Sequence, residues 1–212
     1  VLVLETEHPA AIRRQVSLCE AVYEGETAVE GMRSIRVETL ADADAVWAQN
    51  AVPVLIDPTG ACLPQARPAV LVDAIIAKKN LGTTINMAPL VIGVGPGFTA
   101  GKGVHLVIES MRGHNLARII TDGMAQPNTG VPGNIAGFTS ERVIHAPAAG
   151  YIYDVRKIGD IVQKGDEIAR IYPDKGSYDN KLSEYVPVNA TITGIIRGLI
   201  REGYYFKEGF KI

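Results

Sequence analysis

Residues 146–168, APAAGYIYDVRKIGDIVQKGDEI, return as residues 190–212, ATITGIIRGLIREGYYFKEGFKI, at a constant offset of 44 and without a gap. The matching positions are Ala146, Gly150, Gly159, Gly165 and Ile168 with Ala190, Gly194, Gly203, Gly209 and Ile212, and apolar Ile152, Val155 and Val162 with Ile196, Leu199 and Phe206. Matching glycines mark matching turns, and matching apolar positions mark one buried face. The repeat therefore predicts two similar all-β halves related by a pseudo-twofold axis.

The repeat also resembles a known type of domain. Its pattern G-D-x-V-x-x-G-D-x-I, at 159–168, resembles the barrel-sandwich hybrid of biotinyl and lipoyl domains. Those domains carry their cofactor on a lysine between the two halves, and here that connection, IYPDKGSYDNKLSEYVPV, contains Lys175 and Lys181. The connection is long and lacks the AMKM-type or DKA-type tight turn. We therefore expect two solvated lysines and no covalent lipoate or biotin, with a carrier as an alternative.

The N-terminal part alternates apolar strands with short helices. The strand patterns are VLVLE, PVLID, AVLVD and APLVIGVG, and helices are expected over roughly 10–22 and 40–49. This alternation is typical of an α/β layer with a mainly parallel sheet. Because VLVLE begins at the first residue, we expect the first strand of such a sheet to be missing from the chain.

These patterns predict a fold of two domains. The first, over 1–125, is an α/β Rossmann-like parallel-sheet domain without its first strand. A Pro-, Gly- and Asn-rich boundary loop follows over 126–140, and an all-β barrel-sandwich hybrid domain (biotinyl/lipoyl-like) occupies 141–212.

The composition limits the class of partner. The chain is 47% hydrophobic and 21% charged, with a formal net charge of −2, so its overall charge favours neither nucleic acid nor an anionic membrane as a partner. No apolar run approaches the roughly 20 residues that span a bilayer. Cys19 and Cys62 have no ligand-spaced neighbours and form neither a disulfide framework nor a zinc site. We expect a reduced, cytoplasmic protein.

The stretch VIGVGPGFTAGKG, residues 91–103, places a glycine-rich loop directly after a strand. Its glycines are Gly93, Gly95, Gly97, Gly101 and Gly103. Exposed backbone N–H groups in such a loop form a cradle for an anion, but the same glycines also suit sharp turns. The loop is not a P-loop, because Lys102 is followed by Gly103. It is not the dinucleotide fingerprint G-x-G-x-x-G either, because after Gly93 and Gly95 the place of the third glycine is taken by Phe98.

Polar residues gather after this loop. His105, Glu109, Arg112, His114 and Asn115 follow it closely, and Asn128 lies in PNTG. A guanidinium and an imidazole suit a phosphate or a carboxylate, although each residue alone also fits an ordinary structural role. No third ligand for a metal accompanies the His and Glu, so no metal site is predicted. Glu5 closes VLVLE, where an acid of a nucleotide-binding α/β fold bonds the ribose hydroxyls.

Several blocks together resemble one protein family. ETEHPAAIRRQVSLCEAVYEG, VLVDAIIAKKNLGT, APLVIGVGPGFTAGKGVHLVIESMRGHNLARII, PNTGVPGNIAGF and the repeat resemble the YqeB-type accessory proteins of the selenium-dependent molybdenum hydroxylase system. Members usually begin with a G-x-G-D-L-A turn and end with G-D-I-D-P-R, and this chain has neither. G-K-G-V-H also replaces the usual G-x-D-V-H, so an acidic residue near His105 is missing.

The resemblance implies a bacterial maturation factor whose partners are a molybdenum hydroxylase or its maturation machinery and a small anionic ligand. That ligand is expected to be a nucleotide, NAD(P) or similar, or a molybdopterin-type compound. The expected binding residues are Glu5, Gly93, Gly95, Gly97, Phe98, Gly101, His105, Glu109, Arg112, His114, Asn115 and Asn128. Two alternatives stay open: an NAD(P)-dependent oxidoreductase acting on a cofactor precursor, and a non-catalytic docking scaffold.

Overall fold

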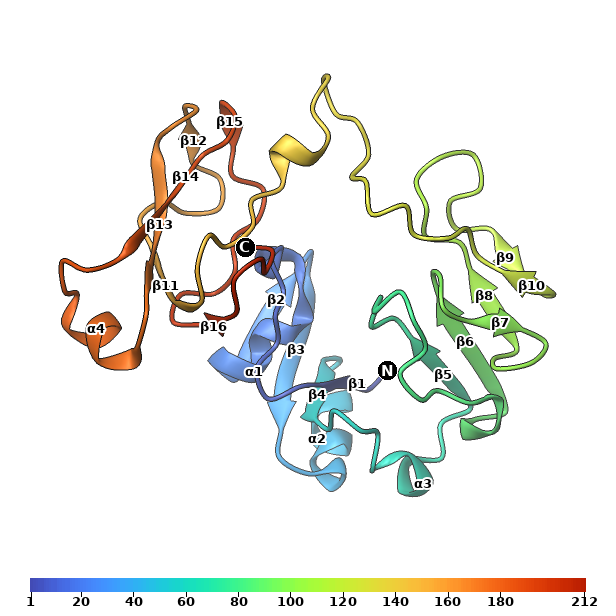
Figure 1. Cartoon of the computed structure of the whole chain (residues 1–212). Coiled ribbons are helices and arrows are strands. Elements are labelled where there is room, and N and C mark those ends of the chain that lie inside the picture. The colour runs from blue at the N-terminus through green and yellow to red at the C-terminus, as the bar shows by residue number, and fades with distance from the viewer. The chain divides into compact units, whose positions relative to one another are not determined.

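A computed structural model describes all 212 residues of the chain. The chain forms two compact units (Figure 1). The first unit combines Val1–Gly60 with Ile135–Ile212, and the second unit is Ala61–Asn134. No helix has both the length and the apolar character needed to cross a membrane.

The N-terminal part of the first unit is a four-stranded sheet of order β1-β4-β3-β2. Its strands are β1 (Val3–Glu5), β2 (Glu26–Val29), β3 (Met32–Val37) and β4 (Val52–Ile56). Strands β1, β4 and β3 run parallel, and β2 pairs antiparallel with β3. Val54 of the central strand β4 is fully buried against Ala21 and Val22.

Short helices connect these strands. They are the 3-10 turns η1 (Arg14–Val16), η2 (Leu18–Glu20) and η3 (Leu40–Asp42), with α1 (Ala21–Glu24) and α2 (Ala43–Trp47). The predicted helix over 10–22 is broken, because Ser17 adopts an extended backbone with φ −128° and ψ 130°. The predicted helix over 40–49 is present in shorter form. It begins with a capping box in which Thr39 and Asp42 each satisfy a backbone N–H of the other.

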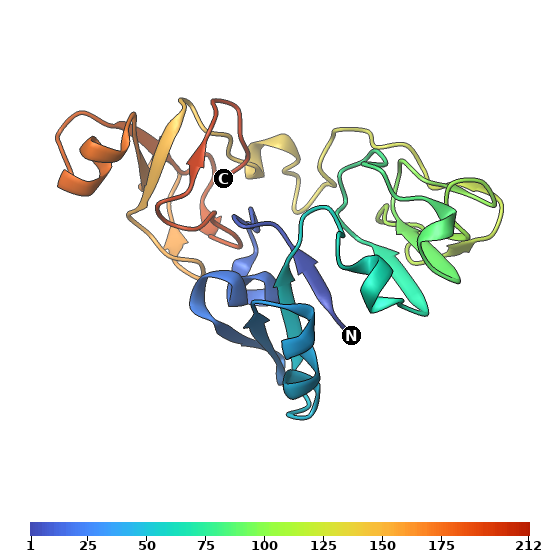
Figure 2. The ribbon, with the colours of Figure 1, turned by 90° about the horizontal axis from the view of Figure 1, so that it is seen from below.

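The C-terminal part of the first unit, drawn in yellow to red in Figure 2, is built from strands that pair antiparallel. Strands β11 (Gly150–Asp154), β13 (Glu167–Tyr172), β14 (Val186–Asn189) and β16 (Tyr205–Phe206) form a sheet of order β14-β13-β11-β16, and β12 (Ile161–Val162) pairs with β15 (Gly194–Ile195). Two short helices, η5 (Ser140–Arg142) and α4 (Lys175–Asn180), complete this part. The pattern did not predict α4, although Asp174 caps it by accepting from the Ser177 N–H.

The sequence repeat has a counterpart in the hydrogen bonding. Gly150 pairs with Phe206 in one sheet, and Val162 pairs with Gly194 in the other, so residues 44 positions apart exchange roles. In the same way, the Gly165 N–H donates to the Ala190 oxygen at 2.8 Å, and the Gly209 N–H donates to the Ala146 oxygen at 2.9 Å. The two halves are therefore related by a local pseudo-twofold axis.

Contacts between distant segments explain why residues 1–60 and 135–212 form one unit. The Leu199 N–H donates to the Ile12 oxygen at 2.9 Å, and Arg201 pairs with both Glu20 and Glu24. Arg14 reaches Asp154 at 3.3 Å.

The second unit is built on a four-stranded sheet of order β5-β6-β8-β9. Strands β5 (Val70–Asp73), β6 (Leu90–Val94) and β8 (Leu106–Ile108) run parallel, and β9 (Ile119–Ile120) is antiparallel to β8. The short strands β7 (Thr99–Ala100) and β10 (Gly123–Met124) pair with each other, and α3 (Leu63–Ala66) and η4 (Ile85–Met87) precede β5 and β6. Val91, Val104 and Val107 are fully buried in the core of this unit.

The predicted combination of a Rossmann-like domain with a barrel-sandwich hybrid domain is wrong. Residues 1–125 contribute two separate four-stranded sheets that belong to different units. Their α-helices, α1 to α3, have only four or five residues each and are too short to layer both faces of a doubly wound sheet. The all-β segment shares a unit with residues 1–60 and consists of a four-stranded and a two-stranded sheet. The chain is thus a mixed α/β protein with several small sheets.

Candidate functional site

The second unit contains a sheet edge of the kind that binds ligands. Its three parallel strands β5, β6 and β8 end at Asp73, Val94 and Ile108, and we call this side of the sheet the carboxyl edge. In open α/β sheets, ligands bind outside the carboxyl ends of parallel strands. The segments that leave this edge are residues 74–84, the glycine loop from 95 to 98, and residues 109–117.

Asp73 folds the first of these segments back onto itself. Its carboxylate accepts from the Ile75 N–H at 3.1 Å and from the Thr83 hydroxyl at 2.6 Å. Asp73 is buried, whereas Lys78 and Lys79 in the same segment are exposed. Neither lysine was among the residues predicted to bind a ligand, although both follow closely after a strand that ends in an acid, a position that could have indicated them.

Gly95 and Gly97 allow the three segments to meet. Gly95 has φ +83°, and a Cβ there would lie 2.6 Å from the Ser110 Oγ. Gly97 has φ +109°, and a Cβ there would lie 2.6 Å from the Lys79 Cα. Both positions combine a backbone conformation that favours glycine with a close approach of another segment. The glycines therefore bring residues 79 and 110 against the loop, and the Gly95 N–H donates to the Ile108 oxygen at 2.8 Å.

Other predicted loop residues have structural surroundings. Phe98 is only 4% exposed and lies in the core, where its ring fills the space that a Cβ on Gly93 would occupy. Gly101, with φ +77°, lies in the turn before β8, and its N–H donates to the Val104 oxygen. Phe98 and Gly93 hold the loop from the inside, and Gly101 lies away from the carboxyl edge.

Glu109 follows β8 and connects two backbone segments through its carboxylate. It is 3% exposed, and its two carboxylate oxygens accept from the Met111 and Gln126 N–H groups, each at 2.8 Å. Burial alone would raise the pKa of Glu109, but the backbone N–H groups of Gln126, Met111 and Ser110 outweigh it and hold this pKa below its ordinary value. Each oxygen of the carboxylate thus already accepts from the backbone, which gives Glu109 a structural role at the end of β8.

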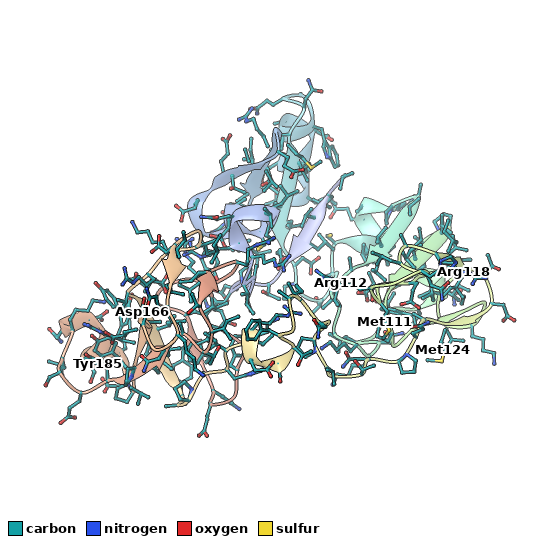
Figure 3. The ribbon with its side chains drawn as sticks, turned by 90° about the horizontal axis from the view of Figure 1, so that it is seen from above. Met111, Arg112, Arg118, Met124, Asp166 and Tyr185 are labelled. Atoms are coloured by element: carbon teal, nitrogen blue, oxygen red, sulfur yellow. The ribbon has the colours of Figure 1, made fainter.

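Arg112 and His114 are exposed polar residues that follow Glu109 in the chain. Neither side chain forms an ion pair or a hydrogen bond within the chain. Figure 3 shows Arg112 apart from Arg118 and Met124, which line another pocket of this unit. Arg112 is therefore free to meet an anion at the carboxyl edge.

The second unit is basic in a chain that is acidic as a whole. It contains six Lys or Arg residues and three Asp or Glu residues, a formal charge of +3, whereas the whole chain has −2. Two of its three acids, Asp73 and Glu109, are buried and hydrogen-bonded to neighbouring segments. The exposed charge at the carboxyl edge is therefore almost entirely positive.

The structure separates His105 from Arg112. His105 precedes β8 and Arg112 follows it, so the two lie toward opposite ends of that strand. The Val91 N–H donates to the His105 Nδ1 at 2.9 Å, and the ring lines a pocket at the beginning of the parallel strands.

The remaining predicted residues lie elsewhere. Asn115 lines a polar pocket of about 370 Å³ together with Glu109, Arg118 and Asp122, so two of the predicted residues meet there. Asn128 is exposed in the segment after β10. Glu5 ends β1 in the first unit, where its carboxylate accepts from the Thr6 N–H at 3.0 Å. The predicted set of residues is thus divided among several places.

The two lysines between the repeat halves are held by neighbouring side chains. The Lys175 Nζ lies 2.8 Å from a carboxylate oxygen of Asp179. The Lys181 Nζ lies 3.8 Å from the ring centroid of Tyr178 and 4.1 Å from that of Tyr153. These contacts stabilise the ammonium groups on the sheet surface.

The chain is 45% identical over all of its 212 residues to the uncharacterized protein YqeB of Escherichia coli (strain K12). The chain is a homologue of part of YqeB. It spans 37% of the length of that protein, and this similarity supports the resemblance to YqeB-type proteins. The role in a selenium-dependent molybdenum hydroxylase system stays a prediction. No protein-family model matches the chain.

Solved structures show only a weak likeness. They include a product-bound ectoine utilization protein EutE (DoeB) from Ruegeria pomeroyi, a succinylglutamate desuccinylase from Silicibacter sp. TM1040 and an aspartoacylase family protein from Mesorhizobium loti. Their identities are 13%, 16% and 13%, and their TM-scores are 0.29, 0.29 and 0.30. Each match covers 100% of this chain and 82–83% of the other chain. TM-scores this low do not establish a shared fold.

Proposed function

We propose that the carboxyl edge of the second unit binds a phosphate-bearing ligand, a nucleotide or a molybdopterin-type compound. The observation that carries this proposal is the meeting of three segments at Gly95 and Gly97. These segments present the exposed basic residues Lys78, Lys79, Arg112 and His114.

The chemistry of these groups suits a phosphate. A guanidinium such as that of Arg112 forms two parallel hydrogen bonds to phosphate oxygens, and lysines act as point charges beside it. Asp73 and Glu109 use their carboxylates on the Thr83 hydroxyl and on backbone N–H groups, so they do not oppose an anion as free surface charges.

The biological role follows from the resemblance to YqeB-type proteins. We propose that the chain acts as an accessory factor in the maturation of a selenium-dependent molybdenum hydroxylase. Its second unit would hold the anionic cofactor or its precursor. Similarity to YqeB over the whole chain supports the resemblance on which this proposal rests, and the basic carboxyl edge offers a place for the ligand.

The binding test is a calorimetric titration with inorganic pyrophosphate, NADH, ATP, CTP and a molybdopterin nucleotide. We expect saturable binding of at least one of them to the unmodified chain. Arg112→Ala should weaken that binding by roughly tenfold or more, since a hydrogen bond to a charged group contributes about 1.5–3 kcal/mol. Lys102→Ala is the matched control, because Lys102 is an exposed cation of the same unit in the turn before β8.

Equal losses in the two variants would mean that only the general charge of the unit matters, and would contradict a site at the carboxyl edge. The accessory role is tested separately, by deleting the gene and measuring the cofactor content of the molybdenum hydroxylase in the same host. A hydroxylase with its full cofactor content in the deletion strain would contradict the accessory role, whereas the binding proposal is decided by the titration alone.

A further inference from the structure

A second pocket of this unit lies at the opposite, amino edge of the sheet, where the parallel strands begin. Its volume is about 540 Å³, within the range of roughly 300–1,000 Å³ that is typical of small-molecule sites. It is formed by α3 and the residues after it, by η4 and the residues after it, and by His105 at the start of β8. No acidic side chain lines it.

His105 is oriented by the backbone. Its Nδ1 accepts the Val91 N–H at 2.9 Å, and the His105 N–H donates to the Val91 oxygen at 2.9 Å. With Nδ1 accepting, the proton of the neutral ring resides on Nε2. Nε2 is therefore the ring atom left to donate a hydrogen bond to a ligand.

Arg67 supplies a cation to the same pocket. Its side chain forms no ion pair or hydrogen bond within the chain. Its backbone has φ +44°, in the left-handed region, where a residue with a Cβ is strained by about 1–2 kcal/mol relative to the right-handed conformation. The Arg67 N–H donates to the Leu63 oxygen and ends α3. A position that favours glycine thus holds an unpaired guanidinium beside the pocket.

The rest of the lining is mainly apolar. It comprises Leu63, Pro64, Pro68, Ile85, Met87, Ala88 and Pro89, with the polar amide of Asn86. The exposed lining therefore mixes polar groups with apolar side chains, an arrangement that suits a small organic molecule with one charged end. The cation of Arg67 and the Nε2–H of His105 both favour an acceptor that carries a negative charge.

We propose that the amino-edge pocket binds a small organic carboxylate, whose charged group meets Arg67 and His105 and whose apolar body lies against the prolines and Met87. This site is independent of the phosphate site at the carboxyl edge, because the two use different residues at opposite ends of the same strands.

The experiment is an NMR titration of the isotope-labelled chain with benzoate, and with benzamide as a neutral probe of the same shape. We expect saturable shifts of the Val91 amide and the His105 ring with benzoate, and at least about tenfold weaker binding of benzamide, because a charge-assisted hydrogen bond is lost. Arg67→Ala should weaken benzoate binding by a similar factor. Lys102→Ala, which removes an exposed cation of the same unit, should leave it unchanged.

His105→Asn is a second variant that separates the contributions of the two ring nitrogens. Its side-chain oxygen preserves an acceptor for the Val91 N–H, while the donor at Nε2 is lost. We expect weaker benzoate binding in a chain whose other amide resonances keep their positions. Equal affinity for benzoate and benzamide, or unchanged binding in Arg67→Ala, would overturn the proposal. Shifts confined to residues outside the pocket, or no shift with either probe, would also overturn it.

Discussion

Asp154, at the end of β11, should make the first unit less stable as the pH rises. Its side chain is 9% exposed, one carboxylate oxygen lies 3.3 Å from the Arg14 guanidinium, and the other has no hydrogen-bond partner. Burial raises the pKa of Asp154 to about 7, Arg14 opposes the rise, and Glu202 adds to it. Because the pKa is higher in the folded than in the unfolded chain, the folded state binds the proton more tightly.

The stabilising contribution is therefore complete below the unfolded pKa of 3.8 and is lost as the pH rises toward 7. One pKa unit corresponds to about 1.4 kcal/mol, so the loss between pH 5 and pH 8 is about 2–3 kcal/mol. The assay is urea unfolding monitored by the fluorescence of Trp47, the single tryptophan, which lies in this unit.

The variant Asp154→Asn should lose most of this dependence on pH, whereas Asp179→Asn, an exposed acid of the same unit, should keep it. A wild-type chain equally stable at pH 5 and pH 8 would contradict a raised pKa of Asp154 in the folded state. An undiminished decline in Asp154→Asn would assign the dependence to another group.

Three further predictions concern hydrogen exchange, stability against urea and pyrophosphate binding. Glu109→Gln should speed hydrogen exchange at the two backbone amides that the carboxylate holds by about 30-fold, equivalent to about 2 kcal/mol, with no change in the first unit. Gly150→Ala should unfold at clearly lower urea than the wild-type chain, because a Cβ there would lie 2.2 Å from the Tyr172 oxygen; Gly194→Ala, at the equivalent repeat position, meets nothing within 4 Å and should be tolerated. Gly97→Ala should displace the loop and weaken pyrophosphate binding measured by calorimetry, whereas Gly103→Ala, whose Cβ would come no closer than 3.9 Å to its neighbours, should bind normally.

Strands were more predictable from the sequence than their assembly into sheets. VLVLE, PVLID, AVLVD and APLVIGVG all contain strands, because continuous apolar runs bounded by turn residues fit buried parallel strands. The alternation of strands with short helices nevertheless suggested one sheet over residues 1–125. It gave no sign that the chain begins a new sheet after Gly60 or that Leu199 pairs with Ile12, since such contacts depend on distant segments.

The candidate site was predictable only in part. The glycine loop and Arg112 were grouped because they are close in sequence, and both follow parallel strands of one sheet, the loop after β6 and Arg112 after β8; that they bind one ligand stays a prediction. His105 was grouped with them because it is close in sequence, but three residues of extended strand between His105 and Glu109 carry the chain across the sheet. The buried roles of Glu109 and Phe98 also could not be seen from residue type, because acids and aromatic residues serve both in sites and in packing.

An NMR titration with inorganic pyrophosphate locates the anion on the chain and so tests directly whether the carboxyl edge of the second unit is its binding site. We expect saturable shifts of the amides of Lys79, Gly95, Gly97 and Arg112, with no change around His105. Shifts spread evenly over the exposed lysines and arginines of both units, or concentrated outside the carboxyl edge, would contradict the claim that this edge is an anion-binding site.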